Sequence, residues 1–404
     1  MKKIDGGVCA PSGFKACGIH CGVRKNKTKK DLAIIAADTV CSAAGTFTRN
    51  KVKAAPVRMC IDVLKKGTAQ AIICNSGNAN ACAPNGYENA QRMAKACGDA
   101  LGISQDLVLV ASTGVIGQEL PIDVIEKGVP LAITELGDNS DAAANAIMTT
   151  DTVKKEVAIE TEICGKTVRL GGICKGSGMI HPNMGTMLCF MTTDAAITPD
   201  AIKKALLECV ERTFNCVSVD GDTSTNDSAI LLASGTAGNE LITGEESCGW
   251  KEFISALEEI CRELARAIAR DGEGATHLVT CNLKGAENKA VAVGLAKSVI
   301  SSALVKAAMF GADANWGRVI CAMGYSGEPL NPEQVDISFA SSAGSILVCK
   351  DGAGVDFDED LAKKILTQEE IEINIDLRAG DAQATAWGCD LTYDYVKING
   401  DYRT

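Results

Sequence analysis

The chain has 404 residues, of which 46% are hydrophobic and only 4% aromatic, so its core is built mainly from small and aliphatic side chains. This length is enough for two or three domain-sized cores. The net charge of −11 and the pI near 5.0 argue against a nucleic-acid-binding protein, because such proteins neutralise phosphates with a basic face.

Targeting signals and cysteines indicate the compartment. No apolar run reaches the length of about 18 residues that a transmembrane helix requires, and the start MKKIDGGVCAPSGFKACG lacks the apolar segment of a signal peptide. The 19 cysteines are scattered, often inside apolar runs, which predicts buried, reduced side chains. Cys17, His20 and Cys21 lack a second ligand pair, so no metal site is predicted. We therefore expect a cytoplasmic protein.

The first half of the chain reads as short strands with one clear helix. DLAIIAAD and AQAIICNSGNANAC predict buried strands that end in Gly/Asn turns. Apolar spacing predicts a helix over residues 86–102, followed by the strand LVLVASTG. KEVAIETEI alternates in polarity, and the Cys164–Gly165 turn joins it to KTVRLGGI as a β-hairpin.

The second half alternates strands and helices. Helices are predicted over residues 199–214 and 249–274 and around residues 292–310. The predicted strands are MLCFMTTD, CVSVD, AILLASG, HLVTCNL, GRVICAMG, SILVCKDG, IEINIDL and CDLTYDYVKI. This pattern predicts an α/β or α+β protein with mixed sheets packed against helices.

Several familiar motifs are incomplete. The three histidines, His20, His181 and His277, come without a G-x-S-x-G elbow, so a histidine-centred triad is not expected. GKT at residues 165–167 is a hairpin turn rather than a phosphate loop. DGDTSTND at residues 220–227 begins like a calcium loop, but Thr225 replaces the required glycine and Leu231 the bidentate glutamate. No G-x-G-x-x-G follows a strand.

Thr186 stands between a Gly/Pro/Asn-rich turn and an apolar strand. Once N-terminal, a threonine carries its own general base, because an α-amine has a pKa of about 8. An internal threonine becomes N-terminal if its hydroxyl attacks the preceding carbonyl and the resulting ester hydrolyses. Gly185, without a Cβ, leaves that carbonyl unhindered. The residues alone leave two readings open, this nucleophile and an ordinary threonine at the start of a strand.

Several sequence motifs, which occur in the same order as in a known protein family, decide between these two readings of Thr186. The chain closely resembles the ArgJ family of ornithine acetyltransferases, also called glutamate N-acetyltransferases. The likeness extends from APSGF near the N-terminus to the last residue. The motifs that carry it are NSGNANAC (75–82), VASTGVIG (110–117), IMTTDT (147–152), KGSGMIHPNMGTML (175–188), RDGEGATH (270–277), FGADANWGR (310–318) and ATAWGCDLTYDYVKINGDYRT (384–404).

The resemblance implies a DmpA/ArgJ-like fold of two α/β domains and self-cleavage between Gly185 and Thr186. The products are an α chain (1–185) and a β chain (186–404) that stay associated. Thr186 would accept the acetyl group of N2-acetyl-L-ornithine and pass it to L-glutamate in a ping-pong cycle. Thr113 and Gly114 would form the oxyanion hole. The substrate-contacting set would be Thr149, Lys175, Thr186, Glu273, Asn399 and Thr404.

The resemblance also implies partners and co-substrates. No metal or cofactor is required, acetyl-CoA is a second donor if the enzyme is bifunctional, and the assembly would be an (αβ)2 heterotetramer without nucleic acid or membrane. Two positions depart from the family pattern, Gly185 for alanine and His277 for lysine. Three alternatives stay open: a monofunctional ornithine acetyltransferase, an N-terminal-nucleophile amidase or aminopeptidase, and a non-enzymatic binding protein.

Overall fold

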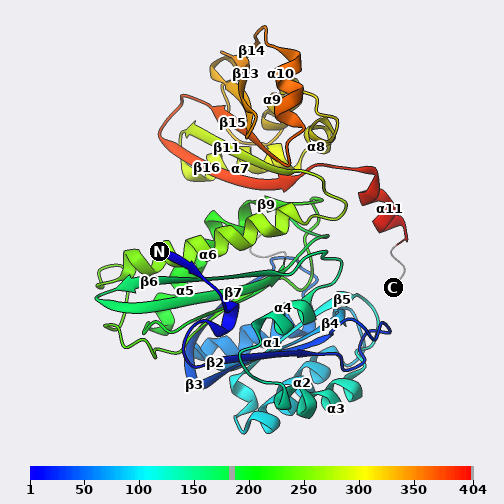
Figure 1. The fold of residues 1–404 in the computed structure, drawn as a ribbon, viewed down its shortest axis with the longest axis vertical. Coiled ribbons are helices and arrows are strands. Elements are labelled where there is room, and N and C mark those ends of the chain that lie inside the picture. The colour runs from blue at the N-terminus through cyan, green and yellow to red at the C-terminus, as the bar shows by residue number, and fades with distance from the viewer. Residues whose placement is uncertain (182–186, 402–404) are drawn as a thin grey trace. The chain divides into compact units, whose positions relative to one another are not determined.

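The structure is a computed structural model that describes residues 1–181 and 187–401. These residues form two compact units. The first unit contains residues 1–176, 187–214 and 223–264, and the second contains residues 177–181, 215–222 and 265–401. Each unit is built around one sheet (Figure 1). The first unit contains strands from both sides of residue 186. The boundary between the two compact units therefore differs from the boundary between the predicted α and β chains.

The first unit contains a nine-stranded mixed sheet. Its order is β1-β6-β7-β8-β10-β3-β4-β5, and β2 pairs with β3. The strands are β1 (Lys2–Ile4), β2 (Phe14–Ile19), β3 (Leu32–Phe47), β4 (Thr68–Asn78), β5 (Val108–Val115), β6 (Lys155–Ile163), β7 (Lys166–Lys175), β8 (Leu188–Thr193) and β10 (Ser228–Ala233). The helices are α1 (Ala55–Val63), α2 (Gly86–Leu101), α3 (Ile122–Thr134), α4 (Ser140–Ile147), α5 (Pro199–Arg212) and α6 (Trp250–Arg270), whose last residues belong to the second unit.

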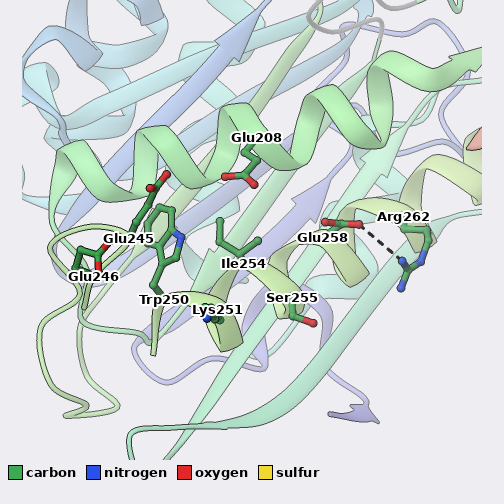
Figure 2. Close-up of a pocket in the computed structure, with 9 residues that line it drawn as sticks. All are labelled: Glu208, Glu245, Glu246, Trp250, Lys251, Ile254, Ser255, Glu258 and Arg262. Carbon is green, nitrogen blue, oxygen red and sulfur yellow. Dashed lines mark ion pairs between the residues drawn. The ribbon is translucent and has the colours of Figure 1, made fainter. Parts of the chain in front are cut away.

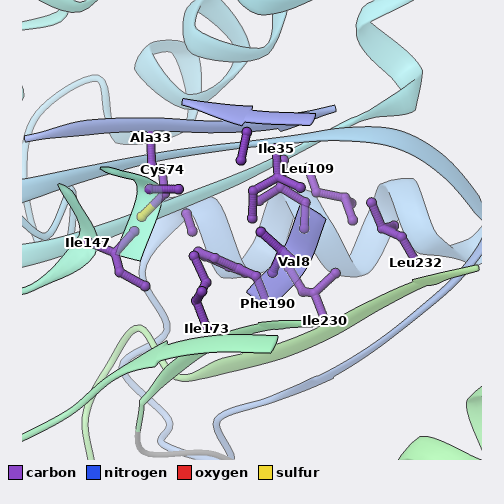
Figure 3. Packing of buried hydrophobic residues seen from close by; sticks show 14 of the residues in the cluster. Val8, Ala33, Ile35, Cys74, Leu109, Ile147, Ile173, Phe190, Ile230 and Leu232 are labelled. Atoms are coloured by element: carbon purple, nitrogen blue, oxygen red, sulfur yellow. The ribbon is translucent and has the colours of Figure 1, made fainter. Parts of the chain in front are cut away.

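The long strand β3 joins the two halves of this sheet. Its first part pairs with β2 and β4, and Ser42–Phe47 pairs with β10. The register with β4 shifts between Ala36 and Cys41, as at a β-bulge, and such irregularities bend a strand. Ile35 of β3, Leu109 of β5, Ile173 of β7 and Phe190 of β8 meet in one buried cluster (Figure 3). The sheet therefore curves around a common core.

Local sequence explains the predicted hairpin. Strands β6 and β7 pair from Lys155–Cys174 to Ile163–Lys166. Cys164 and Gly165 occupy the turn with φ of 48° and 72°, the left-handed conformations that a two-residue type I′ turn requires. The hairpin prediction is confirmed, and so is the helix over residues 86–102, which is α2.

The second unit contains a seven-stranded mixed sheet in the order β14-β13-β12-β15-β11-β16-β9. The strands are β9 (Val217–Ser218), β11 (Leu278–Ala286), β12 (Asp336–Ser341), β13 (Gly344–Lys350), β14 (Ala353–Gly354), β15 (Glu370–Asp376) and β16 (Ala382–Cys389). The helices are α7 (Lys289–Ser301), α8 (Ala303–Phe310), α9 (Trp316–Gly324), α10 (Glu359–Leu366) and α11 (Tyr393–Asp401). Both sheets mix parallel and antiparallel pairs, so the predicted fold class is confirmed.

Two predicted strands of the second unit are wrong. GRVICAMG lies in helix α9, because Asn315 caps its start by accepting a hydrogen bond from the Arg318 amide at 3.2 Å. Its buried residues Val319, Ala322 and Met323 have helical spacing. In CDLTYDYVKI, strand β16 ends at Cys389 and helix α11 follows, starting beside Thr392, whose hydroxyl accepts from the Tyr395 amide at 3.3 Å.

The long helix predicted around residues 292–310 is two helices. Ser302 is extended, ends α7 and caps α8 through its hydroxyl. In the described part of the chain, no single helix is long and apolar enough to cross a membrane. Helices α7 and α8 have the length and apolar composition of a membrane span only when they are taken together, and the chain is bent between them. Helix α7 buries Leu295 and Val299 and packs on β11 and β16, as a core helix does.

The cysteines are mostly buried, as predicted, with a few exceptions at the surface. Cys164 of the β6–β7 turn forms a disulfide with Cys248, so the prediction of reduced cysteines is wrong for this pair. Neither residue is buried, and each precedes a glycine in a turn rather than lying within an apolar strand. Cys82 and Cys321 are also exposed.

Candidate active site

Thr113 and Gly114, the predicted oxyanion pair, lie at the end of β5. Here β4 and β5 lose their regular register, because Asn78 pairs with both Thr113 and Val115. Gly114 has φ of 131°, and a Cβ on it would come within 2.4 Å of the Gly77 carbonyl carbon. Only glycine fits such a position. Register irregularities of this kind re-aim backbone groups near active sites.

A buried polar network fixes the end of β5. The Ser112 hydroxyl donates to Asn75 Oδ1 at 2.6 Å, and Asn75 Nδ2 donates to the Asn78 carbonyl at 2.9 Å. Asn226 Nδ2 donates to the Ser112 carbonyl at 2.8 Å. All four residues are buried. The network ties the TSTND loop, which contains Asn226, to the residue before Thr113. Its role was not predicted, although two of its members belong to the motif NSGNANAC.

Thr149 and Lys175 come together in the first unit. Lys175 Nζ lies 3.4 Å from Thr149 Oγ1. Between their segments lies Asp151, whose carboxylate accepts from the amides of Thr149 at 2.9 Å and Gly176 at 2.7 Å. It also binds Lys155 Nζ at 2.7 Å, in an ion pair whose side chains are only 0% and 1% exposed. Asp151 thus joins the segments that carry the two predicted site residues.

The ionisation of Asp151 follows from these contacts. Burial acts to raise its pKa, but the ammonium groups of Lys155 and Lys175 and the Thr149 amide outweigh it, so the pKa lies below the ordinary value. The group is therefore an anion at neutral pH. Sequence reasoning missed both Asp151 and Lys155, because nothing in MTTDTVKK separates a buried ion pair from surface charges.

Glu273 and Asn399 come together in the second unit. Asn399 Nδ2 donates to Glu273 Oε2 at 2.8 Å. Glu273 is 9% exposed, and its amide donates to the Ser177 carbonyl at 3.0 Å. A Cβ on Gly178 would come within 2.3 Å of the Glu273 carboxylate, so a larger residue there would displace this carboxylate. The second unit therefore holds a largely buried carboxylate with an amide partner.

The remaining predicted site residues, Gly185, Thr186 and Thr404, lie outside the described residues. In the first unit, Thr113 and Gly114 lie at the end of β5, and Lys175 contacts Thr149. In the second unit, Asn399 contacts Glu273.

The residues set aside from sequence have structural roles. His20 Nδ1 lies 3.0 Å from the Asp31 carboxylate and 3.0 Å from the Lys29 carbonyl. His277, at a position where the resemblance predicts lysine, pairs with the buried Asp390 at 3.1 Å. In the basic run RKNKTKK, residues 25–29 are exposed as predicted, but Arg24 is partly buried and its guanidinium donates to the Met148 carbonyl, next to Thr149.

A hollow between α5 and α6 in the first unit is a different feature. It has a volume of about 590 Å³ and is lined by Glu208, Glu245, Trp250, Glu258 and Arg262, among others (Figure 2). None of the predicted site residues line it. Three of its carboxylates already have cationic partners, since Arg212 pairs with Glu208 and Glu258, and Lys204 with Glu245. We assign it no role in the chemistry.

Two mixed sheets packed with helices define an α/β protein, and each of its two units holds charged or polar side chains that are predicted to belong to an active site. Comparisons with known proteins identify its family. Residues 15–404 match the profile of the ArgJ family. "Arginine biosynthesis bifunctional protein ArgJ 1" of Clostridium acetobutylicum is 52% identical over 394 residues, which cover 97% of this chain and 96% of that protein.

Two solved structures are similar to parts of the chain. The "arginine biosynthesis bifunctional protein argJ" of Bacillus halodurans is 46% identical and matches 53% of this chain and 98% of the solved chain, with a TM-score of 0.50. The "Ornithine Acetyltransferase complexed with Ornithine" of Mycobacterium tuberculosis is 39% identical and matches 46% of this chain and 99% of the solved chain, with a TM-score of 0.42. The chain belongs to the ArgJ family, and it is an enzyme of arginine biosynthesis.

Proposed function

We propose that the enzyme transfers the acetyl group of N2-acetyl-L-ornithine to L-glutamate through an ester on Thr186. The observation that carries the proposal is the contact between Lys175 Nζ and Thr149 Oγ1 at 3.4 Å. These two residues come from separate motifs, KGSGMIHPNMGTML and IMTTDT, and both are predicted to contact the same substrate. A site assembled from distant segments and held by the buried Asp151 is the arrangement that substrate recognition needs.

In the proposed first half-reaction, Thr186 Oγ attacks the acetyl carbonyl carbon while the α-amine of Thr186 takes the hydroxyl proton. The Thr113 hydroxyl and the Gly114 N–H stabilise the tetrahedral oxyanion. When the intermediate collapses, the α-ammonium returns the proton to the leaving nitrogen, and ornithine departs. In the second half-reaction, the α-amine of glutamate attacks the acetyl ester and regenerates the Thr186 hydroxyl.

The charged groups orient the substrate in this proposal. Lys175 neutralises the substrate carboxylate, and its contact with Thr149 limits where the ammonium can move. Glu273 binds the side-chain ammonium of ornithine. Because Glu273 is 9% exposed and has Asn399 as a partner, it offers a pre-oriented carboxylate with little water to displace. Thr404, the last residue of the sequence, would complete the site.

Self-cleavage before Thr186 is part of the proposal. The solved Bacillus halodurans chain is covered to 98% yet matches only 53% of this chain, which fits a separate β-chain product, since residues 186–404 are 54% of 404. The sheet of the first unit explains how the products would stay together. Strands β8 and β10, from the β chain, lie between β7 and β3, from the α chain.

The remaining assignments rest on the family resemblance. We propose an (αβ)2 assembly and a transfer that needs neither metal nor cofactor, with acetyl-CoA as a second acetyl donor. Light scattering during size-exclusion chromatography tests the assembly. Acetylglutamate formation after exhaustive treatment with chelator tests the second point. Assays with acetyl-CoA alone separate a bifunctional from a monofunctional enzyme.

The variant Thr186→Ala tests the nucleophile. The wild type should give two bands on a denaturing gel, with threonine as the new N-terminus, and should gain one acetyl group on the β chain when acetylornithine is added without glutamate. Thr186→Ala should remain one chain and lose transfer, whereas Thr186→Ser, which keeps a hydroxyl, should retain both. Full activity in Thr186→Ala would contradict the proposal. Acetate release without acetylglutamate would favour a hydrolase.

A further inference from the structure

The motif DGDTSTND contains a carboxyl group that the proposed mechanism does not use. Asp227 closes this motif and directly precedes β10. It is 2% exposed, and within residues 1–181 and 187–401 its Oδ2 atom has no hydrogen-bond partner. A buried polar atom without a partner costs free energy in the folded state. A catalytic role is one of the explanations known for such atoms in native structures.

The sheet places Asp227 next to a row of residues that includes Lys175. Lys175 of β7 pairs with Leu188 of β8, and Leu188 pairs with Ser228 of β10, so these three residues form one row across the sheet. The Ser228 amide donates to the Met187 carbonyl at 2.8 Å. Asp227 is therefore beside Met187, the residue that follows Thr186 in the chain. Thr186 itself lies outside the described residues.

The other neighbours of Asp227 also belong to the site. The adjacent Asn226 donates to the carbonyl of Ser112, the residue before Thr113. The charged group that faces the Asp227 carboxyl is the Lys175 ammonium, and the hydroxyls of Ser224 and Thr48 approach it. Burial raises the pKa of Asp227 well above its ordinary value, against the opposing effect of Lys175. Burial of this kind favours the neutral form of the carboxyl, which has one O–H donor and one acceptor.

Self-cleavage needs a proton carrier other than the α-amine of Thr186. In the mature enzyme the α-amine of Thr186 is the base, but in the precursor this nitrogen is an amide and is not basic. The Thr186 hydroxyl must lose a proton as it attacks the Gly185 carbonyl carbon, and the Thr186 nitrogen must gain one as the C–N bond breaks. A neutral carboxyl does both, since one oxygen donates a proton while the other accepts one.

We propose that Asp227 carries the proton from the Thr186 hydroxyl to the Thr186 nitrogen during self-cleavage. The O–C bond forms, the C–N bond breaks, and the carboxyl is regenerated in its neutral form. Water then hydrolyses the Gly185 ester and frees both chains. This inference rests on the proposed function, because it requires cleavage at Gly185–Thr186.

The variant Asp227→Asn tests the inference, because an amide of the same shape hydrogen-bonds but does not exchange its proton. Cleavage is followed by pulse labelling and denaturing gels, and Asp222→Asn, an exposed aspartate of the same motif, is the matched control. General acid–base catalysis contributes about 10²–10⁴-fold, so Asp227→Asn should slow cleavage by at least about 100-fold while Asp222→Asn cleaves like the wild type. Asp227→Glu, which keeps a carboxyl, should cleave measurably faster than Asp227→Asn.

Cleavage of Asp227→Asn at the wild-type rate would overturn the inference and leave the proposed function intact. A wild type that is never cleaved would contradict the proposed function itself. Circular dichroism of the purified precursor separates a chemical defect from misfolding. If Asp227→Asn does not fold, the pH dependence of wild-type cleavage decides. The rate should fall as pH rises through the raised pKa of the carboxyl, and a rate that rises steadily with pH would overturn the inference.

Discussion

Two buried carboxyl groups act on the same lysine in the first unit, yet their surroundings differ. Asp151 accepts hydrogen bonds from Lys155 and from the amides of Thr149 and Gly176. Asp227 has an oxygen without a partner in the described structure. Against the effect of burial, the contacts of Asp151 lower its pKa, whereas burial raises that of Asp227. The pKa values of the two carboxyls are shifted in opposite directions. This difference distinguishes Asp151, a structural anion, from Asp227, the proposed proton carrier.

The variant Asp151→Ala should have the largest effect on this comparison. It leaves the Lys155 ammonium buried without its carboxylate and removes the acceptor of two backbone amides. Breaking a buried ion pair by removing one partner costs about 3–5 kcal/mol. We expect the free energy of unfolding, measured by urea denaturation followed by circular dichroism, to fall by that amount. A loss below about 1 kcal/mol would show that Asp151 is not a structural anion.

Removing both charges should restore part of the loss. In Asp151→Ala/Lys155→Met the uncompensated ammonium is gone, although the two amides still lack their acceptor. Coupling between residues in contact is about 0.5–3 kcal/mol, so the double variant should be more stable than Asp151→Ala by an amount in this range. The same urea titration measures it. Equal stability of the two variants would mean that the ion pair contributes nothing.

The variant Asp227→Asn should increase the free energy of unfolding, whereas Asp151→Ala should decrease it. Because the folded-state pKa of Asp227 is raised, ionisation favours the unfolded chain as pH increases above the ordinary value of 3.8. Replacing the carboxyl with a neutral amide should stabilise the protein at pH 7 by about 0.5–2 kcal/mol, as is common for strained functional groups. The gain should shrink when the titration is repeated at acidic pH. A destabilised variant at neutral pH would place Asp227 in the same class as Asp151.

The pH response of Asp151 has the opposite sign. Its folded-state pKa is lowered, so the stability that it contributes is present above the ordinary value of 3.8 and is lost as the pH falls further. Comparing each variant with the wild type at both pH values therefore distinguishes the two carboxyls without reference to catalysis.

The smallest effect is expected at Lys154, the immediate neighbour of Lys155. Lys154 pairs with Asp141 and Glu156, but its side chain is 41% exposed. Exposed ion pairs contribute about 0–1 kcal/mol. Lys154→Ala should therefore change the free energy of unfolding by less than about 0.5 kcal/mol, well below the effect at the adjacent buried pair. A larger loss would show that the contrast between the two pairs does not depend on burial.

Sequence patterns predicted the fold best where local chemistry agrees with the tertiary structure. The Cys164–Gly165 turn has the left-handed residues of a hairpin, and α2 has the apolar spacing of a helix. GRVICAMG failed because a short apolar run fits a strand or a helix equally well. The Asn315 cap and the packing of Val319 and Met323 decide in favour of the helix.

For the candidate site, the sequence motifs predicted residues that the structure brings together within each unit, Thr149 with Lys175 and Glu273 with Asn399. Their roles stay predictions. The supporting residues could not be recognised, because burial distinguishes Asp151 and Asp227 from the other acidic residues, and burial is a property of the tertiary structure. The alternating order β7-β8-β10-β3 was equally hidden, since strand pairing between distant segments leaves no local pattern.

That strand order has a consequence for biosynthesis. Cleavage before Thr186 would separate β8 and β10 from the peptide backbone of β7 and β3, although they are neighbours in the finished sheet. The segments must reach this arrangement while still covalently joined, so maturation would come after folding. Every molecule then receives one copy of each fragment, and synthesis from two separate genes would have to solve a pairing problem that a single precursor avoids.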